Sequence, residues 1–268
     1  MMQAAPDIAI IVPVFNEEEN ILPLADEIAA AMGGVEHSYE LMFVDDASTD
    51  TTPERIAEAQ ARHPHVRGLR HERNAGQSAA LWTGIQATQS AIVVTLDGDR
   101  QNDPVDLPKL LAALEDCDFV CGVRGQRQDN WVRRISTKVA RSARRFVLKV
   151  DFCDTGCAFR AFRREALRGI FAFNGMHRFL PVLVHANGFT TREIEIGHRP
   201  RVAGESKYGL GNRLWRGIYD LIAIAWYQKR RIPELPVEKI PPAPAERRPV
   251  ASVEIKARAP ERQPVEAR

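Results

Sequence analysis

Two carboxylates separated by one residue, in Asp97-Gly98-Asp99, follow directly after an apolar run that ends at Leu96. Such a run predicts a buried strand, and ligands collect at the carboxyl ends of strands in open α/β sheets. Carboxylate oxygens there can hold Mg²⁺ or Mn²⁺ against a diphosphate, and Gln101 could add an amide oxygen. The alternative is an ordinary Asp-Gly turn. The position after a strand favours a metal site at Asp97, Asp99 and Gln101.

Two further polar segments follow predicted strands. Pro13 to Glu17 comes after one apolar run, and we expect a helix to begin at Asn16 or Glu17 with its N-terminus at the same edge. Asp46 comes two residues after Val44, so strand periodicity places both on one side, where a carboxylate suits a nucleobase. Asp45 is expected to support the loop. The alternative for both segments is a simple cap or turn into a helix.

The elements that must position these residues alternate along the first half of the chain. Apolar runs predict strands at 8–14, 41–44, 66–69, 91–96 and 118–123. Between them, helices are predicted at 17–32, after a Ser48-Thr49-Asp50 cap, after the Asn74-x-Gly76 turn and from Asp103-Pro104. Alternation of this kind predicts an α/β fold with a mostly parallel sheet and helices on both faces.

The second half of the chain is less regular. We predict a long basic helix at 130–149, a strand at 157–162, a helix at 177–187, a strand at 189–196 and an amphipathic helix at 210–228. Beyond residue 228 the chain is basic and Pro-rich without apolar periodicity. The sequence therefore predicts one α/β domain over 1–228 and a disordered tail over 229–268.

Composition excludes few classes of protein, because 268 residues with a net charge of +2 are ordinary for a globular domain. The four cysteines form two C-x-x-x-C pairs, at Cys117 and Cys121 and at Cys153 and Cys157, a spacing unlike the usual zinc knuckles. Zinc is the alternative, but we expect reduced thiols in a cytoplasmic chain. We expect no signal peptide, and no run reaches the ~20 apolar residues that a spanning helix needs.

The combined motifs resemble family 2 glycosyltransferases. The resemblance is carried by segments of the first half that occur in order, Pro13 to Glu17, Val44-Asp45-Asp46-x-Ser48, Asn74-x-Gly76 and Asp97-x-Asp99. The second half is similar to the polyprenyl-phosphate sugar transferases, such as dolichyl-phosphate mannosyltransferases and the bacterial undecaprenyl-phosphate 4-deoxy-4-formamido-L-arabinose transferases. The matching segments there are Val132-Arg133-Arg134, Asp154-x-Gly156 and residues 201–208.

This resemblance implies a GT-A fold and a role for each matching residue. The donor would be bound by Pro13, Phe15, Glu17, Val44, Asp46, Asp97, Gly98, Arg124 and Arg133. The metal would be Mg²⁺ or Mn²⁺ on Asp97, Asp99 and Gln101, and catalysis would depend on Asp99, Asp154, Arg201 and Lys207. Arg124, Arg201 and Lys207 would face phosphates. Many relatives have Tyr at Phe15 and Ala at Gly98.

The implied activity is inverting transfer of a sugar from a nucleotide-sugar to a polyprenyl phosphate, with undecaprenyl phosphate as the expected lipid, for the cell envelope. A phosphate monoester has a second pKa of about 6, so the acceptor needs positioning more than deprotonation. Asp154 would be a base or an acceptor-orienting residue, or simply a turn acid. The alternative functions are transfer to a saccharide or soluble acceptor, and non-catalytic nucleotide-sugar binding.

Two predicted helices suit an anionic membrane surface. Arg134, Lys138, Arg141 and Arg145 share one face of the helix at 130–149. The helix at 210–228 carries Trp and aliphatic residues and leads into a basic cluster, Lys229-Arg230-Arg231. We therefore expect peripheral attachment to the cytoplasmic face of the inner membrane, with an integral membrane partner as a further option. Core packing is the alternative for the apolar stripes. Nucleic-acid binding is not expected, since aromatic residues are sparse beside the basic stripe.

Overall fold

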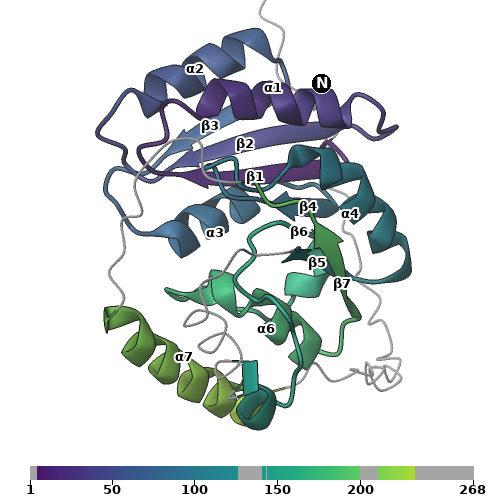
Figure 1. The fold of residues 1–268 in the computed structure, drawn as a ribbon. Helices are drawn as coiled ribbons and strands as arrows, with labels where there is room; N and C mark the ends of the chain where they lie inside the picture. The colour runs from purple at the N-terminus through teal and green to yellow at the C-terminus, as the bar shows by residue number, and fades with distance from the viewer. Residues whose placement is uncertain (1–4, 126–140, 143, 200–210, 233–268) are drawn as a thin grey trace, which may run out of the picture. The chain divides into compact units, whose positions relative to one another are not determined.

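The computed structural model describes residues 5–125, 141–142, 144–199 and 211–232. These residues lie within one compact unit, which extends to Pro233. The described strands are β1 (Ile8–Val14), β2 (Tyr39–Asp45), β3 (Val66–Arg70), β4 (Ile92–Thr95), β5 (Phe119–Arg124), β6 (Arg160–Arg163) and β7 (Thr191–Ile196). They form one sheet in the order β3-β2-β1-β4-β6-β5-β7 (Figure 1). β6 is antiparallel to both neighbours, whereas the other neighbouring strands pair in parallel.

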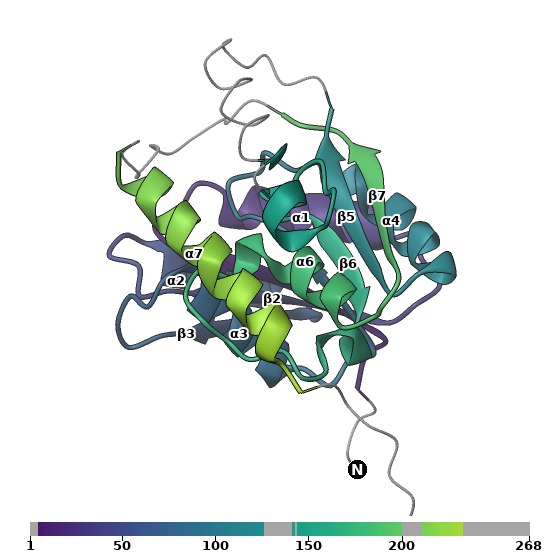
Figure 2. The ribbon, with the colours of Figure 1, turned by 90° about the horizontal axis from the view of Figure 1, so that it is seen from below.

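Helices cover both faces of the sheet. They are α1 (Ile21–Met32), α2 (Thr52–Arg62), α3 (Gln77–Ala87), α4 (Leu107–Ala113), α6 (Leu180–Ala186) and α7 (Gly211–Arg230). Short 3₁₀ helices lie at Pro104–Asp106, Leu114–Asp116, Arg164–Leu167 and Met176–Arg178. One face carries α1, α2 and α4, and the other carries α3 and α6, with α7 lying across them (Figures 1 and 2).

The core divides between the two faces because strand side chains alternate. Ile10 and Val12 of β1 pack toward α1 and α4, whereas Ile11 between them packs toward α3. In β2, Phe43 faces the first layer and Val44 the second. All five side chains are fully buried, so both faces of this part of the sheet are dry. This burial explains why the strands read as continuous apolar runs.

The predicted order of strands and helices in the first half is confirmed, but two helix starts are wrong. α1 begins at Ile21 instead of Asn16 or Glu17, since Asn16 has a positive φ of 54° and leaves the helical path. α2 begins with Thr51 as its N-cap. Asp50 nevertheless accepts a hydrogen bond from the N–H of Thr52 at 3.0 Å, as a capping side chain would.

The later elements also follow the predictions in type. The strands predicted at 157–162 and 189–196 are β6 and β7, and the helix predicted at 177–187 is the 3₁₀ turn Met176–Arg178 followed by α6. The helix predicted at 130–149 is described only at 141–142 and 144–148, so Arg134 and Lys138 lie outside the described residues. The predicted tail beyond 232 also lies outside them, and the division at residue 228 stays a prediction, with α7 continuing to Arg230.

No helix within the described ranges combines the length and the apolar character needed to cross a membrane.

Candidate active site

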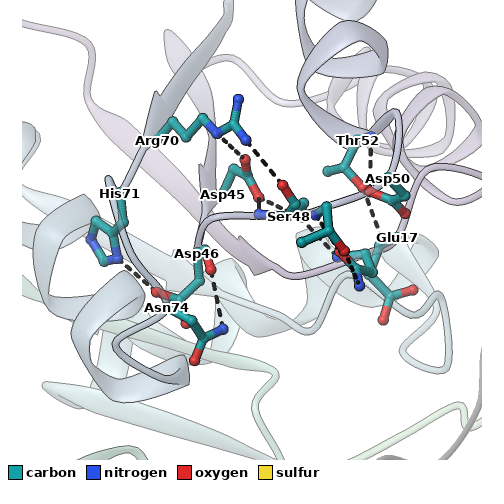
Figure 3. Close-up of polar contacts among 11 residues, drawn as sticks. Glu17, Asp45, Asp46, Ser48, Asp50, Thr52, Arg70, His71 and Asn74 are labelled. Atoms are coloured by element: carbon teal, nitrogen blue, oxygen red, sulfur yellow. Dashed lines mark hydrogen bonds and ion pairs between the residues drawn. The ribbon is translucent and has the colours of Figure 1, made fainter.

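The loops after β1 and β2 are tied together by side-chain hydrogen bonds (Figure 3). The hydroxyl of Ser48 accepts from the N–H of Asn16 at 2.8 Å, and the hydroxyl of Thr52 accepts from the N–H of Glu17 at 2.9 Å. Asp45, which is 1% exposed, accepts from the N–H of Ser48 at 2.9 Å and forms an ion pair with Arg70 at 3.2 Å. Asp45 thus supports the loop, as the sequence predicted, and Glu17 is held at the carboxyl edge of the sheet.

Asp46 holds a third loop against the same edge. Its carboxylate accepts hydrogen bonds from the N–H groups of Ala75 and Gly76 at 2.9 and 2.7 Å, and its backbone carbonyl accepts from Asn74 at 3.1 Å. The Nδ1 atom of His71 lies 2.7 Å from the same carboxylate (Figure 3). The Asn74-x-Gly76 segment is therefore a turn into α3 that Asp46 fixes, and Gly76 adopts a φ of 91° there.

The two acids of Asp97-Gly98-Asp99 follow β4 at this edge. Asp99 is 8% exposed, and Asp97 accepts from the amide of Gln77 at 2.7 Å. Gly98 packs so closely on β1 that an added Cβ would lie 2.6 Å from Val14 and 3.5 Å from the carbonyl oxygen of Pro13. A larger residue there would have to displace Val14.

The nucleoside-binding positions expected from the resemblance share this edge. Pro13 is the β-sheet partner of Val44, and Asp46 donates its N–H to the carbonyl of Val14 at 2.9 Å. Val44 is buried, whereas Pro13, Phe15 and Glu17 are partly exposed. The structure thus brings Pro13, Val44 and Gly98 together, although a role in binding a nucleoside stays a prediction.

The electrostatics of the acidic pair suit a bound cation. Burial and the adjacent charge of Asp99 raise the pKa of Asp97 to about 6, although Arg124, Arg160 and the Gln77 hydrogen bond oppose that rise. Two carboxylates that repel each other in a buried setting are stabilised by a divalent ion. The described residues bring no three His, Cys, Asp or Glu side chains together for a metal. A metal here would rest on Asp97, Asp99 and the amide of Gln101.

Arg124 and Asp154 form a bidentate ion pair beside the acids. The two nitrogen–oxygen distances are 2.6 and 2.8 Å, and the N–H of Gly156 donates to the same carboxylate at 3.2 Å. Burial alone would lower the pKa of Arg124, but Asp154 more than offsets that effect and the pKa is raised. The Arg124 guanidinium fixes the orientation of this carboxylate. The role of Asp154 as a base or an acceptor-orienting residue stays a prediction.

Among the described residues, Arg160 has the largest fully buried side chain, and it was not expected from the sequence. It pairs with Thr95 across the antiparallel β4–β6 contact, which brings its positive charge near Asp97. Its guanidinium donates to the backbone carbonyls of Thr155 and His177, and its Nε atom is buried without a hydrogen-bond partner. The sequence gives no signal for this contact, because β6 enters the sheet between strands that precede it in the chain.

A buried Ser–His pair, also missed from the sequence, links α3 to the turn before α6. Ser78 in the first turn of α3 lies 2.6 Å from the Nδ1 atom of His177 and accepts from the N–H of Gly175 at 3.0 Å. Burial, together with the charges of Arg178 and Arg160, lowers the pKa of His177 to about 3. The imidazole is therefore neutral at physiological pH, and it shares a hydrogen bond with the Ser78 hydroxyl.

Three of the expected site residues, Arg133, Arg201 and Lys207, lie outside the described residues.

Outside the acidic site, the four cysteines are free, and three of them are buried, while Cys153 is exposed. Burial raises the pKa of Cys121 to about 12 and that of Cys157 to about 11, so these thiols are unreactive at neutral pH.

Residues 9–171 match the model of the glycosyl transferase family 2, which is more than half of the chain. The chain belongs to glycosyl transferase family 2. Its relatives include an undecaprenyl-phosphate 4-deoxy-4-formamido-L-arabinose transferase of Aeromonas hydrophila, 35% identical over 80% of this chain and 66% of the relative. A dodecaprenyl-phosphate galacturonate synthase of Rhizobium johnstonii is 34% identical over 83% of this chain and 68% of the relative. The chain thus spans about two thirds of the length of these relatives.

Solved structures of GT-A glycosyltransferases confirm the fold class. Glucosyl-3-phosphoglycerate synthase of Mycobacterium tuberculosis, in complex with Mn²⁺, UDP and glucosyl-3-phosphoglycerate, superposes with a TM-score of 0.60 at 21% identity. The match covers 85% of this chain and 81% of that one. A complex of the same enzyme with Mg²⁺ and UDP gives a TM-score of 0.61. This glycosyltransferase therefore has the GT-A fold that its motifs predicted.

Proposed function

We propose that this glycosyltransferase moves a sugar from a nucleotide-sugar onto a polyprenyl phosphate, with inversion at the anomeric carbon. The observation that carries the proposal is the Asp97–Asp99 pair at the carboxyl edge of β4, in which Asp99 is buried and Asp97 interacts with the charge of Arg124. Both curated relatives named above carry polyprenyl-phosphate sugar transfer in their names, which supports the acceptor class. The lipid expected here is undecaprenyl phosphate.

The donor would lie across the edge formed by β1, β2 and β4. Pro13, Phe15, Glu17, Val44 and Asp46 would line the nucleoside, and the close packing of Gly98 on β1 keeps the two acids beside these residues. Asp97, Asp99 and Gln101 would hold Mg²⁺ or Mn²⁺, which neutralises charge on a departing diphosphate. The structural neighbours bound to Mn²⁺ or Mg²⁺ with UDP support the choice of metal. Arg124, Arg133, Arg201 and Lys207 would supply further positive charge to the phosphates.

The acceptor phosphate would act as the nucleophile. One of its oxygens attacks the anomeric carbon as the bond from that carbon to the nucleoside diphosphate breaks, so the configuration inverts. Because the phosphate is already ionised at neutral pH, the enzyme need only orient it, which agrees with Asp154 being held by Arg124.

Inversion has a direct test. NMR of the glycosyl phosphate product should show the anomeric configuration opposite to that of the donor. Retention of configuration, or a trapped glycosyl-enzyme adduct, would contradict direct attack.

The acceptor requires the enzyme to meet a membrane surface, and α7 offers a face for this. Ile218, Ile222 and Trp226 recur at helical spacing and are 40%, 62% and 65% exposed, whereas Ile224 packs into the core at 3%. Lys229, Arg230 and Arg231 follow at its end. Aromatic and basic residues together suit an anionic interface. We place this peripheral contact on the cytoplasmic face of the inner membrane.

Incubation with a panel of nucleotide-sugars and a short-chain polyprenyl phosphate, followed by mass spectrometry of the lipid, tests the proposal. A glycosylated lipid phosphate that forms only with divalent metal is the expected product. Transfer to a soluble acceptor alone would replace the proposed acceptor. Binding of the nucleotide-sugar without turnover on any acceptor would indicate a non-catalytic binding protein.

A further inference from the structure

Gln77, the first residue of α3, donates a hydrogen bond from its side-chain amide to Oδ1 of Asp97 at 2.7 Å. Within the described residues it is the one side chain that hydrogen-bonds this acid. Asp97 is one of the three proposed metal ligands, whereas Gln77 lies in a different element and has no role in the proposed function. The contact therefore connects α3 to the acidic site.

An amide suits a carboxylate that must also bind a cation. The N–H group of Gln77 can fix the orientation of Asp97 without adding a positive charge that would compete with a divalent ion. The contact is made to Oδ1, and no hydrogen bond from the described residues reaches Oδ2. One oxygen of Asp97 is thus oriented by α3, and the other is left to a further partner.

The backbone on the N-terminal side of Gln77 is fixed by Asp46. This carboxylate is 3% exposed and accepts hydrogen bonds from the N–H groups of Ala75 and Gly76 at 2.9 and 2.7 Å. Gly76 has a φ of 91°, a conformation that favours glycine, and it directly precedes α3. The turn held by Asp46 therefore sets where α3 begins and where Gln77 lies.

The residue on the other side, Ser78, is fixed by a distant part of the chain. Its buried hydroxyl lies 2.6 Å from Nδ1 of His177 and accepts from the N–H of Gly175 at 3.0 Å. The carbonyl of His177 in turn accepts from Arg160 of β6, the strand that pairs with β4. Gln77 therefore lies between two residues that tertiary contacts hold in place relative to the end of β4.

We propose that Gln77 is a positioning residue that holds the Asp97 carboxylate in the orientation that binds the divalent ion. This inference deepens the proposed function and rests on the metal site within it. Residues that hydrogen-bond a metal-ligating carboxylate orient it, and their loss typically lowers metal affinity or activity about 10–100-fold. Because the turn held by Asp46 carries Gln77, the acid of one motif also steadies the metal ligand of another.

The experiment measures how much Mn²⁺ the full chain needs to bind a nucleoside diphosphate. Equilibrium dialysis follows binding of labelled UDP, or of whichever of GDP, CDP and ADP binds wild type more tightly, at a fixed concentration while Mn²⁺ is varied. In Gln77→Met, which cannot donate to Asp97, the Mn²⁺ concentration at half-maximal binding should be on the order of 10–100-fold higher than in wild type. Gln77→Ala, at a partly exposed position in the first turn of a helix, should give the same result and keeps the test open if Gln77→Met folds poorly.

The matched control is Gln86→Met, which makes the same substitution at an exposed position near the end of α3. It should bind the nucleotide at the Mn²⁺ concentrations that wild type needs. An equal Mn²⁺ requirement in wild type, Gln77→Met and Gln86→Met would overturn the proposal. A lower melting temperature of Gln77→Met with an unchanged Mn²⁺ requirement would show that the contact serves stability only, and the proposal also fails.

Turnover separates this inference from the proposed function and from a direct contact with substrate. Gln77→Met should lose much less activity at saturating Mn²⁺ than at limiting Mn²⁺. A loss that is the same at every Mn²⁺ concentration would mean that Gln77 acts on the substrate, which contradicts the positioning role. Metal-dependent nucleotide binding that Gln77→Met weakens, without transfer of sugar to a polyprenyl phosphate by wild type, would contradict the proposed function alone. Normal transfer by wild type, with a Mn²⁺ requirement that Gln77→Met shares, would contradict the role of Gln77 alone.

Discussion

Asp46 belongs to a motif expected to bind a nucleobase, and it also holds a loop in the structure. The sequence placed it beside a nucleobase, and the structure shows it holding the N–H groups of Ala75 and Gly76 as well as the ring of His71. His71 also lies 2.9 Å from the hydroxyl of Thr83 on α3. These contacts occupy three acceptor positions of a carboxylate that is 3% exposed. They explain its role in shaping the loop, and a contact with a nucleobase stays a prediction.

Replacement of Asp99 should have a large effect on turnover. Asp99→Asn removes half of the charge that the proposed site offers a divalent ion. Turnover should fall on the order of 10²-fold or more, the scale of losing a main electrostatic element. Steady-state rates with and without chelator measure this. Asp116→Asn, at an 81% exposed side chain that pairs with Arg192, is the matched control and should retain full rate. An Asp99→Asn enzyme fully active in chelator would rule out the metal site.

The lowered pKa of His177 predicts that the stability of the protein depends on pH. Its pKa is lowered from the ordinary histidine value of 6.5 to about 3 in the folded protein, so the unfolded chain binds the proton more readily between these pH values. The free energy of unfolding should therefore fall as pH drops from about 6.5, with a slope approaching 1.4 kcal/mol per pH unit. In His177→Asn the amide can donate to or accept from the Ser78 hydroxyl without titrating.

Denaturant unfolding of both proteins at several pH values between 4 and 8 isolates this contribution, since other groups titrate alike in each. On acidification, the free energy of unfolding of wild type should fall more steeply than that of His177→Asn. A pH-independent difference would show that His177 titrates normally.

Among the elements, α3 packs unusually close to the sheet. A Cβ at Gly84 would lie 2.5 Å from Ile11 and 3.2 Å from Val44, and neither side chain has free space to move in the buried core. We expect Gly84→Ala to lower the free energy of unfolding by about 1–3 kcal/mol despite the better helix propensity of Ala. Thermal and denaturant unfolding measure the change.

The control for Gly84 is another helical glycine. Gly217 in α7 has no atom within 4 Å of an added Cβ, so Gly217→Ala should leave stability unchanged or raise it by up to about 1 kcal/mol. If both substitutions have the same effect, helix propensity and not close packing decides the outcome at Gly84.

Periodicity predicted the elements that are buried on both faces, such as β1 and β2, because their apolar runs have no other explanation. It failed at the start of α1, where Asn16 with positive φ and the contacts to residues 48–52 delay the helix to Ile21. Those contacts join segments more than 30 residues apart, and local propensity carries no information about them. The ligand-like acids Asp97 and Asp99 were predictable because they follow a strand directly.

Arg160, Gln77 and the Ser78–His177 pair were not predictable in the same way. Each contact joins strands or helices whose pairing the sequence does not state, above all the antiparallel insertion of β6 between β4 and β5. The chemistry of these residues is ordinary, and only the topology brings the contacting partners together. The order of strands in the sheet is therefore what sequence patterns alone could not provide for predicting these contacts.

At the scale of the whole molecule, the proposed donor site is assembled from loops that follow β1, β2 and β4 and from the end of β5. No single segment holds enough of it to bind a nucleoside diphosphate alone. A ligand that needs all of these elements binds the folded state and not the unfolded chain, so binding must stabilise folding.

Mn²⁺ with UDP, or with another nucleoside diphosphate if the base differs, should raise the melting temperature. At about one hundred times the dissociation constant, binding adds about 2.7 kcal/mol to the stability. For a chain of this size that corresponds to on the order of 5–10 °C. Neither component alone should give the full shift, because the diphosphate and the two acids share the ion. Differential scanning fluorimetry measures the shift, and Asp99→Asn should lose most of it while Asp116→Asn keeps it. An equal shift in excess chelator, or in Asp99→Asn, would mean that the nucleotide binds without a metal on this acidic pair.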